Sequence, residues 1–188
     1  MESDELIRNL IDGKLTQEEL YRIISGDKDP ERFRLMLKVL QERAGWDEKI
    51  ILPLSDRLFI VCRDGKAVVK CSCGFEFGDY RENWKLKARI YVRDNEEAMK
   101  EVYKEYLGAN PEWTELREYY CPGCYALLEV EAVPASYPVI FDFLPDIRTF
   151  YQEWLGEEPP CEDLDFKDLS WDYLSRMLSK IDKNSDTC

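Results

Sequence analysis

The sequence predicts an α+β fold, with N-terminal helices, a small antiparallel-sheet core whose four cysteines are spaced as in a zinc ribbon, and C-terminal helices. Three observations predict it. Hydrophobic residues recur at helical spacing up to about residue 49, they alternate with polar residues between about 50 and 133, and two close pairs of cysteines lie in that alternating region. Hydrophobic residues make up 45% of the 188 residues, which is enough for a packed core.

Helices with one apolar face are predicted before residue 49. Thr16 and Glu19 have the spacing of a capping box, so a helix is expected to begin just after Thr16. Asp29-Pro30-Glu31 supplies an N-cap, a first-turn proline and an acidic first turn for the next helix. The apolar faces can either pack on the rest of the chain or fill a groove on a partner subunit. Their residues are Leu6, Ile7, Leu10, Ile11, Leu20, Ile23, Ile24, Phe33, Met36, Leu37 and Leu40.

Short strands are predicted in the middle of the chain. Residues 50–54 and 57–61 are apolar runs typical of buried strands, and Asp64-Gly65 is a hairpin signal. Residues 84–93 alternate most clearly between apolar and basic side chains. We therefore expect 84–93 to form one strand, with its apolar face in the core and its basic face outside.

The second half of the chain alternates between helix and strand signals. A helix capped by Asp94 or Asn95 is expected to run through Tyr106 and to end at Gly108. Strands at 116–120 and 126–130 flank Cys121-Pro122-Gly123-Cys124, which places this second cysteine pair at the tip of a hairpin.

Two further helices are predicted near the C-terminus. One extends from Asp146 to Leu155 and is closed by Gly156, and an amphipathic helix is expected between about 164 and 178. Residues 157–160 separate them and look like a linker. From residue 157 onward there are nine acidic and four basic residues, a net charge of −5.

Four cysteines carry the clearest chemical signal. Cys71 and Cys73 form a C-x-C pair, and Cys121 and Cys124 form a C-x-x-C pair with a proline inside it. Four thiolates in a tetrahedron at about 2.3 Å are the ligands of a structural zinc site. The i, i+2 spacing of the first pair requires a turn or a bulge, because alternate strand residues point to opposite faces. Iron in a rubredoxin-like centre, or two unrelated pairs of reduced thiols, are the alternatives.

A zinc bound by four cysteines has no open position for a substrate, so we expect a structural role for it. Gly74 and Gly123 are expected to let backbone N–H groups approach the sulfur atoms. From the changes in periodicity and composition we expect three regions, namely an N-terminal helical segment (1–49), a zinc-binding α+β core with a closing helix (50–156), and an acidic, helical C-terminal extension (157–188). The basic residues expected to offset the thiolate charge are Lys66, Lys70, Arg81 and Lys85.

The composition excludes several classes of function. The chain has no histidine, which excludes a Ser-His-Asp or Cys-His catalytic set and histidine metal ligands, and it has no phosphate-binding glycine loop. The net charge of −13 argues against nucleic-acid and anionic-membrane partners. We therefore predict no catalytic and no cofactor-binding residues in this chain apart from the metal ligands. Carboxylates such as Glu76 and Asp79 are expected to lie on a solvated face.

The remaining cysteines are expected to be reduced. The acidic residues 1–5 do not resemble a secretory signal, and no apolar run approaches the roughly 18 residues of a membrane span, so we expect a cytoplasmic, thiol-reducing location. Cys62 is expected to be a small core residue. Cys161 and Cys188 lie in the acidic extension, where they would be poor nucleophiles.

Several segments up to about Gly156 combine residues in a specific way. They are 29–33, 41–43, 46–54, 83–86, 92–94, 117–119, 137–140 and 150–156. In these segments the chain resembles the gamma subunit of acetone carboxylase. The cysteine positions of that family fall on Cys71, Cys73, Cys121 and Cys124, the same four residues that their spacing selects.

The resemblance implies a place in an α2β2γ2 enzyme that converts acetone and bicarbonate to acetoacetate, a C–C bond-forming ligase reaction driven by ATP. ATP with Mg²⁺, and a redox-active Mn²⁺ or iron, would belong to the alpha and beta subunits. The small subunit would carry zinc, would be inactive alone, and would serve assembly or the shaping of a channel. A free-standing zinc-ribbon adaptor that binds other proteins is the alternative.

The sequence also departs from the family pattern. Phe75 follows the first cysteine pair where the family suggests histidine, and Tyr125 follows the second pair where glycine is expected. The extension after Pro159 goes beyond the pattern, which leaves the identity of the ketone open.

Overall fold

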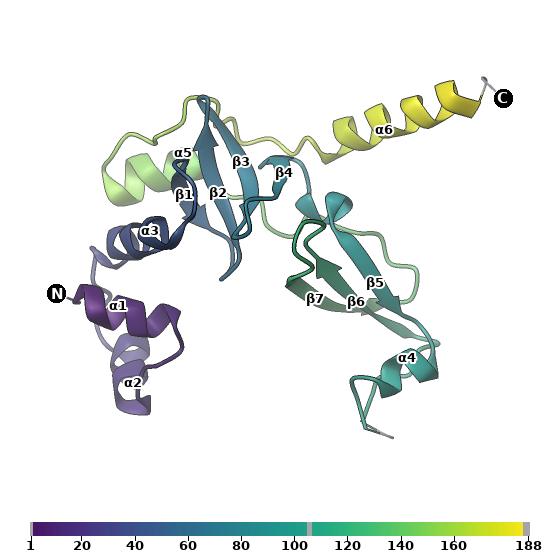
Figure 1. Ribbon diagram of the computed structural model, residues 1–188, viewed down its shortest axis with the longest axis horizontal. Helices are drawn as coiled ribbons and strands as arrows, with labels where there is room; N and C mark the ends of the chain where they lie inside the picture. The colour runs from purple at the N-terminus through teal and green to yellow at the C-terminus, as the bar shows by residue number, and fades with distance from the viewer. Residues whose placement is uncertain (1, 105–106, 186–188) are drawn as a thin grey trace.

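Two small antiparallel sheets form the centre of the fold, and helices lie at both ends of the chain (Figure 1). In the computed structural model, which describes residues 2–104 and 107–185, the first sheet has the order β1-β2-β3-β4 and the second β5-β6-β7. The predicted α+β class is confirmed, although two separate sheets form in the described residues where one was expected. The strands are β1 (Lys49–Pro53), β2 (Leu58–Arg63), β3 (Lys66–Cys71), β4 (Glu76–Asp79), β5 (Arg89–Arg93), β6 (Thr114–Tyr120) and β7 (Leu127–Pro134).

The predicted N-terminal helices are present as α1 (Asp4–Ile11), α2 (Gln17–Ser25) and α3 (Arg32–Arg43). The capping box of α2 is confirmed, because the Thr16 hydroxyl accepts a hydrogen bond from Glu19 N and the Glu19 carboxylate accepts one from Thr16 N. Helices α1 and α3 pack together and α3 also packs on β1. Helix α2 buries none of its residues, so the alternative of a partner-binding face remains open for α2 alone.

The first sheet is apolar on both faces. The β2–β3 hairpin turns at Asp64 and Gly65, whose φ angles of 50° and 76° suit the predicted two-residue turn. Strand β2 is buried from Leu58 to Val61, as expected for a strand covered on both sides. One of its faces packs against α3, and the other against the helical turns that begin at Ile147.

Residues 84–93 do not form the single strand that their alternation predicts. Trp84–Lys87 forms a short 3-10 helix, η1, because the Asn83 side chain accepts a hydrogen bond from Lys85 N and caps that turn. Strand β5 begins only at Arg89. Its burial is also the reverse of the prediction, with Ile90 40% exposed and Arg93 8% exposed.

Ionic side chains fill much of the second sheet. Arg93 is buried because its guanidinium donates to the Glu118 carboxylate at 3.1 Å and to the Ala98 carbonyl at 2.8 Å. On the other face, the fully buried Lys85 ammonium contacts Glu129 at 2.7 Å and Asp142 at 2.9 Å, and it also pairs with Glu131. Buried charges are tolerated only when they are paired in this way. Strand alternation misidentified the interior because these charged residues occupy it.

The later helices agree with the sequence in part. Helix α4 (Glu96–Lys100) is capped by Asn95 but ends well before the predicted Tyr106, which lies outside the described residues. Helix α5 (Ile147–Thr149) continues as a π-helical turn, η2 (Phe150–Leu155), and Gly156 ends it at a φ of 66°, as predicted. The last helix, α6 (Ser170–Ser185), begins later than expected because the residues before it lie in extended form against the first sheet.

A strap of residues 157–169 holds the extension against the first sheet. Cys161 forms a disulfide with Cys62 of β2, and Leu164 is buried. The backbone of Asp163 forms an isolated parallel β-bridge with the backbone of Lys66. The expectation of reduced thiols at Cys62 and Cys161 is therefore wrong for this structure. Spacing could not reveal the pair, because its members are separated by 99 positions. Cys188 lies outside the described residues.

Replacement of Lys85 by Met tests the ionic interior. Lys85→Met keeps the aliphatic bulk but leaves three carboxylates without their cation, so we expect the free energy of unfolding to fall by about 3–5 kcal/mol. Urea denaturation followed by circular dichroism measures the change. Lys100→Met is the matched control, since Lys100 pairs with Glu96 on the surface and its loss should cost less than about 0.5 kcal/mol. A cost below 1 kcal/mol for Lys85→Met, on the same order as the surface control, would contradict this interpretation.

Candidate metal centre

The four predicted cysteines meet at the junction of the two sheets. Cys71 ends β3 and Cys73 lies in the turn to β4, whereas Cys121 and Cys124 lie in the turn between β6 and β7. All four Sγ atoms lie within 4.8 Å of one another. The structure therefore brings together residues from two distant parts of the sequence.

The sulfur spacing suits a tetrahedral metal. The Sγ atoms of Cys71 and Cys124 are 3.8 Å apart, and those of Cys73 and Cys121 are 3.7 Å apart. Four sulfur atoms at 2.3 Å from a tetrahedral zinc would be separated by about 3.8 Å. None of the four is in a disulfide. The arrangement can hold a metal ion and is compatible with a structural zinc.

A tight turn makes the C-x-C pair converge. Gly74 has a φ of 94°, a conformation that glycine adopts without strain, and its N–H donates to the Cys71 carbonyl at 2.8 Å. Phe75 closes the turn, because its carbonyl accepts a hydrogen bond from Cys71 N at 2.8 Å. The predicted turn after the first pair is thus present.

The C-x-x-C pair lies in a matching turn. Cys121 N donates to the Ala126 carbonyl at 3.0 Å, and Tyr125 N donates to the Cys121 carbonyl at 2.9 Å. Tyr125 has a φ of 59°, in the left-handed region that favours glycine. The left-handed backbone explains why the family pattern has glycine at this position. Tyr125 adopts the same turn although its Cβ is crowded in that conformation. Arg89 lies over its exposed ring at 5.1 Å.

Backbone N–H groups face the sulfur atoms. Gly123 N donates to Cys121 Sγ at 3.4 Å. A hydrogen bond from the Ala126 backbone lowers the pKa of the Cys124 thiol. Burial raises the pKa of Cys71 to about 12 and also raises the pKa of Cys121. The second turn therefore favours the thiolate of Cys124, whereas burial disfavours the thiolates of Cys71 and Cys121.

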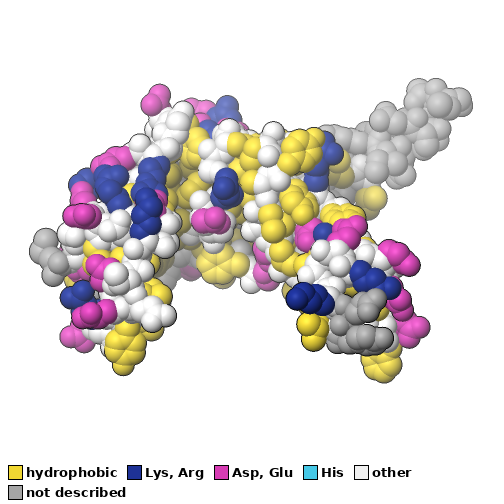
Figure 2. Space-filling model, turned by 60° about the horizontal axis from the view of Figure 1, so that its bottom comes forward, with side chains coloured by type: hydrophobic (Ala, Val, Ile, Leu, Met, Phe, Trp, Pro, Cys, Tyr) yellow, Lys and Arg dark blue, Asp and Glu magenta, His cyan; other side chains and the backbone are white. Residues whose placement is uncertain are grey.

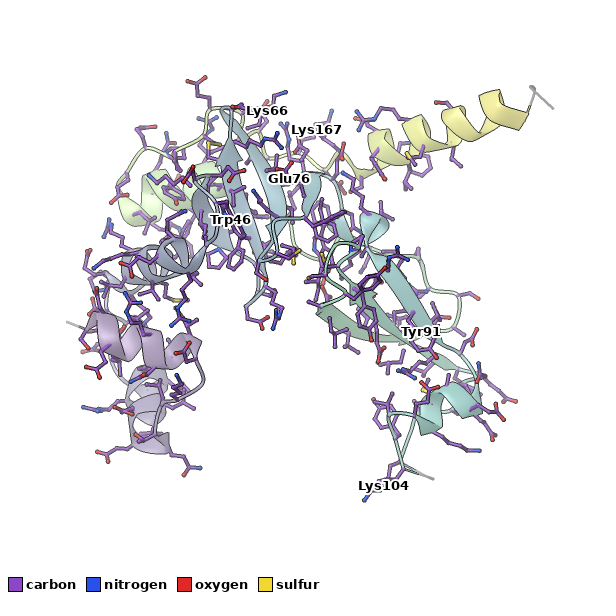
Figure 3. All side chains as sticks on the ribbon, in the orientation of Figure 1. Trp46, Lys66, Glu76, Tyr91, Lys104 and Lys167 are labelled. Carbon is purple, nitrogen blue, oxygen red and sulfur yellow. A yellow bond between two sulfur atoms is a disulfide. The ribbon has the colours of Figure 1, made fainter. Side chains whose placement is uncertain are left out.

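The basic side chains predicted to offset the thiolates are engaged elsewhere. Lys70 pairs with Glu48 at 2.7 Å, Arg81 pairs with Asp79 at 2.7 Å, and Lys85 lies in its own carboxylate cluster. Lys66, labelled in Figure 3, is at the opposite end of β3 from Cys71. That expectation was therefore wrong. Three of these basic side chains bind carboxylates that approach them in the folded chain, and closeness in sequence to the cysteines did not reveal those partners.

The two carboxylates near the first cysteine pair are part of ion pairs. Glu76 accepts a hydrogen bond from Arg63 at 2.6 Å, and Asp79 binds Arg81. Both side chains are only partly exposed, so the predicted solvated face is a surface of ion pairs.

An aromatic row continues the junction away from the cysteines. A Cβ added at Gly123 would lie 3.0 Å from Phe75 Cβ, so the second turn packs directly on the first. Ring centroids are 5.1 Å apart for Phe75 and Phe77, 5.7 Å for Phe77 and Trp84, and 6.0 Å for Trp84 and Tyr119. Phe75 therefore gives the junction an apolar contact where the family pattern suggests histidine.

A second group of possible metal ligands was not found from the sequence. Carboxylate oxygens of Glu129, Glu131 and Asp142 lie within 4.8 Å of one another. The Lys85 ammonium is bonded to all three, so this group is a buried ion cluster with its cation already in place. The alternation of Glu129 and Glu131 on β7, opposite Tyr119 and Arg117, was the available signal.

A family model and one relative indicate the same family. The model of the acetone carboxylase gamma subunit family matches residues 44–155, which include all four cysteines. An acetone carboxylase gamma subunit from Xanthobacter autotrophicus is 49% identical over 156 residues, covering 82% of this chain and 93% of that protein. An acetophenone carboxylase beta subunit from Aromatoleum aromaticum is 31% identical over 110 residues, covering 57% of this chain and 78% of that protein. No helix in the described part of the chain is long and apolar enough to cross a membrane.

A pair of substitutions at Tyr125 tests the left-handed turn. Tyr125→Gly and Tyr125→Ala both remove the ring and its contact with Arg89, but only glycine relieves the backbone strain. We expect Tyr125→Gly to be more stable than Tyr125→Ala by about 1 kcal/mol. Urea unfolding of the two variants measures the difference. Equal stabilities would show that the turn does not impose a left-handed conformation.

Proposed function

The chain belongs to the acetone carboxylase gamma subunit family, and we propose that it is the small, zinc-binding subunit of an ATP-dependent ketone carboxylase. The relative from Xanthobacter, at 49% identity, supports acetone as the ketone. The proposed reaction forms acetoacetate from acetone and bicarbonate. A second relative is a subunit of an acetophenone enzyme, which supports a multi-subunit carboxylase as the setting. The proposed assembly is α2β2γ2.

The four-thiol geometry supports a structural zinc in this chain. Two of the thiols come from the first sheet and two from the second, so one ion bound by Cys71, Cys73, Cys121 and Cys124 would join the sheets. Bound zinc supplies strong, directional bonds that replace a larger hydrophobic core. The short S···S distances are the observation that carries this part of the proposal.

Catalysis is proposed to belong to the larger subunits. A zinc with four cysteine ligands has no open position, and the sequence contains neither histidine nor a phosphate-binding loop. ATP with Mg²⁺ and the Mn²⁺ or iron of the reaction would therefore be bound by the alpha and beta subunits. This chain would contribute to assembly or to the shaping of a channel between their sites.

The extended shape of the chain supports a role in assembly. Its accessible surface is 12163 Å², whereas a compact monomer of this mass exposes about 9,400 Å². Figure 2 shows the N-terminal helices and the α4 end of the second sheet as two projections, with hydrophobic side chains on the face between them. A subunit that binds several partners at once would use such a surface.

We propose the division into 1–49, 50–156 and 157–188 as the functional units of the chain. A cytoplasmic location is also part of the proposal. Besides the Cys62–Cys161 disulfide, the strap is held by noncovalent contacts, which include the buried Leu164 and the Asp163–Arg81 ion pair.

Metal analysis tests the structural zinc. We expect about one zinc per chain, and we expect Cys121→Ser to lose the metal and more than about 4 kcal/mol of unfolding free energy, because metal loss separates the sheets. Elemental analysis and thermal unfolding measure both quantities. Cys188→Ser is the control, since Cys188 is outside the set of four, and it should keep both the zinc and the stability. Bound iron in place of zinc, or an unchanged Cys121→Ser protein, would contradict the proposal.

Activity measurements test the division of labour. The purified chain alone should show no ketone-dependent ATP hydrolysis and no carboxylation, whereas the complex with its larger subunits should show both. A particle of several hundred kilodaltons containing this chain is expected in extracts of cells grown on ketones, whereas a free-standing adaptor would be found as a monomer. Ketone-dependent ATP hydrolysis by the isolated chain would refute a non-catalytic role.

A further inference from the structure

We infer that helix α6 is a docking arm whose apolar face binds a larger subunit of the carboxylase, in an apolar groove with a rim of lysine and arginine. The inference rests on the proposed function and goes beyond it, because it assigns the contact to one element. Helix α6 extends away from both sheets (Figure 1).

The first turn of α6 has a fixed position. The Ser170 hydroxyl accepts a hydrogen bond from Asn83 N at 2.9 Å, and Leu169 N donates to the Arg81 carbonyl at 2.9 Å. Just before it, Leu164 is buried and Asp163 pairs with Arg81 at 2.9 Å. The start of the helix is therefore anchored to the segment between β4 and η1, so a partner would meet an arm that is already oriented.

Two side chains decide which face of α6 turns inward. The Lys87 ammonium lies 4.6 Å from the centroid of the Tyr173 ring, and Arg176 pairs with Glu82. These contacts direct one side of the helix toward the body of the chain. Trp171 and Leu178 lie on a different side at a spacing of two turns, and they are 76% and 59% exposed.

The exposed face has the pattern of a helix that binds in a groove. Trp171, Leu174 and Leu178 are spaced at i, i+3 and i+7, which aligns them in one apolar stripe. An isolated helix of this length is marginally stable in water, and an amphipathic helix normally gains its stability by burying that stripe. Tryptophan is also among the residues that most often dominate the energy of an interface.

Charge identifies the occupant of this face. Residues 163–172, which lead into the first turn of α6, carry four aspartates and one lysine, and the whole chain carries −13, so a second copy of this chain would be repelled. Asp165, Asp168 and Asp172 are all exposed around the start of α6. A groove bordered by basic side chains on a different subunit complements both the stripe and the acidic residues beside it.

Two double variants of the full-length chain test the inference. Trp171→Ser with Leu178→Ser removes the two most exposed residues of the apolar stripe, and Ser175→Ala with Ser179→Ala changes exposed serines beside the stripe and serves as the control. Each is mixed with the larger subunits, and its affinity is measured by titration and by size-exclusion chromatography. We expect the serine variant to bind at least about 100-fold more weakly, because two interface anchors are lost. The control should bind as tightly as the wild-type chain.

The outcomes separate this inference from the proposed function. Zinc content and circular dichroism of the serine variant should be unchanged, because both substituted side chains are exposed. Wild-type affinity for the serine variant would overturn the docking arm while leaving the proposed function intact. Failure of the wild-type chain to bind the larger subunits would overturn both. A wild-type dimer that the serine substitutions dissociate would identify a second copy as the occupant and would also overturn the inference.

Discussion

Convergence of four sulfur atoms at the junction of two small sheets is the constraint on which the remaining structure depends. The hydrophobic core lies mainly on the two faces of the first sheet, and the cysteine turns that follow β3 and β6 meet where Phe75 packs on Gly123. The aromatic row through Trp84 carries that contact into the second sheet. Cys71 ends the β3 ladder and the other three ligands lie in turns, so each sheet keeps its own register while the ligand set fixes their relative position.

The second sheet shows a different solution to the problem of a small interior. Lys85 and Arg93 lie on opposite faces of this sheet, and each is matched by carboxylates from neighbouring strands or loops. Burial raises the pKa of Tyr119, whose hydroxyl donates to Glu131 at 2.7 Å. Such a network gives little net stability compared with apolar packing, but it tolerates few alternative arrangements, because each misplacement leaves a buried charge unpaired.

Several local signals were read correctly from the sequence, but the predicted cap at Asp29 was wrong, because α3 begins only at Arg32 and has no side-chain cap. Most long-range pairings were not predicted. The capping box at Thr16, the turn at Asp64-Gly65 and the helix end at Gly156 depend on neighbouring residues, and all three were predicted. The four cysteines could be grouped because metal chemistry restricts ligand type and spacing. The Cys62–Cys161 pair and the partners of Lys85 depend on how distant segments pack, so no local pattern reveals them. The alternation in 84–93 gave a wrong prediction of which side chains are buried, because the prediction took the buried face to be apolar.

The exposed apolar side chains of α2 affect what happens to a copy of the chain that is not assembled with partner subunits. Helix α2 presents Tyr21 at 72% and Ile24 at 64% exposure with none of its residues buried. A copy left without its companions would therefore be prone to aggregate and to be degraded. The cell would then have to make this chain and its partner subunits at matched rates to keep this chain soluble. That need is separate from the need of the enzyme for all its subunits in catalysis.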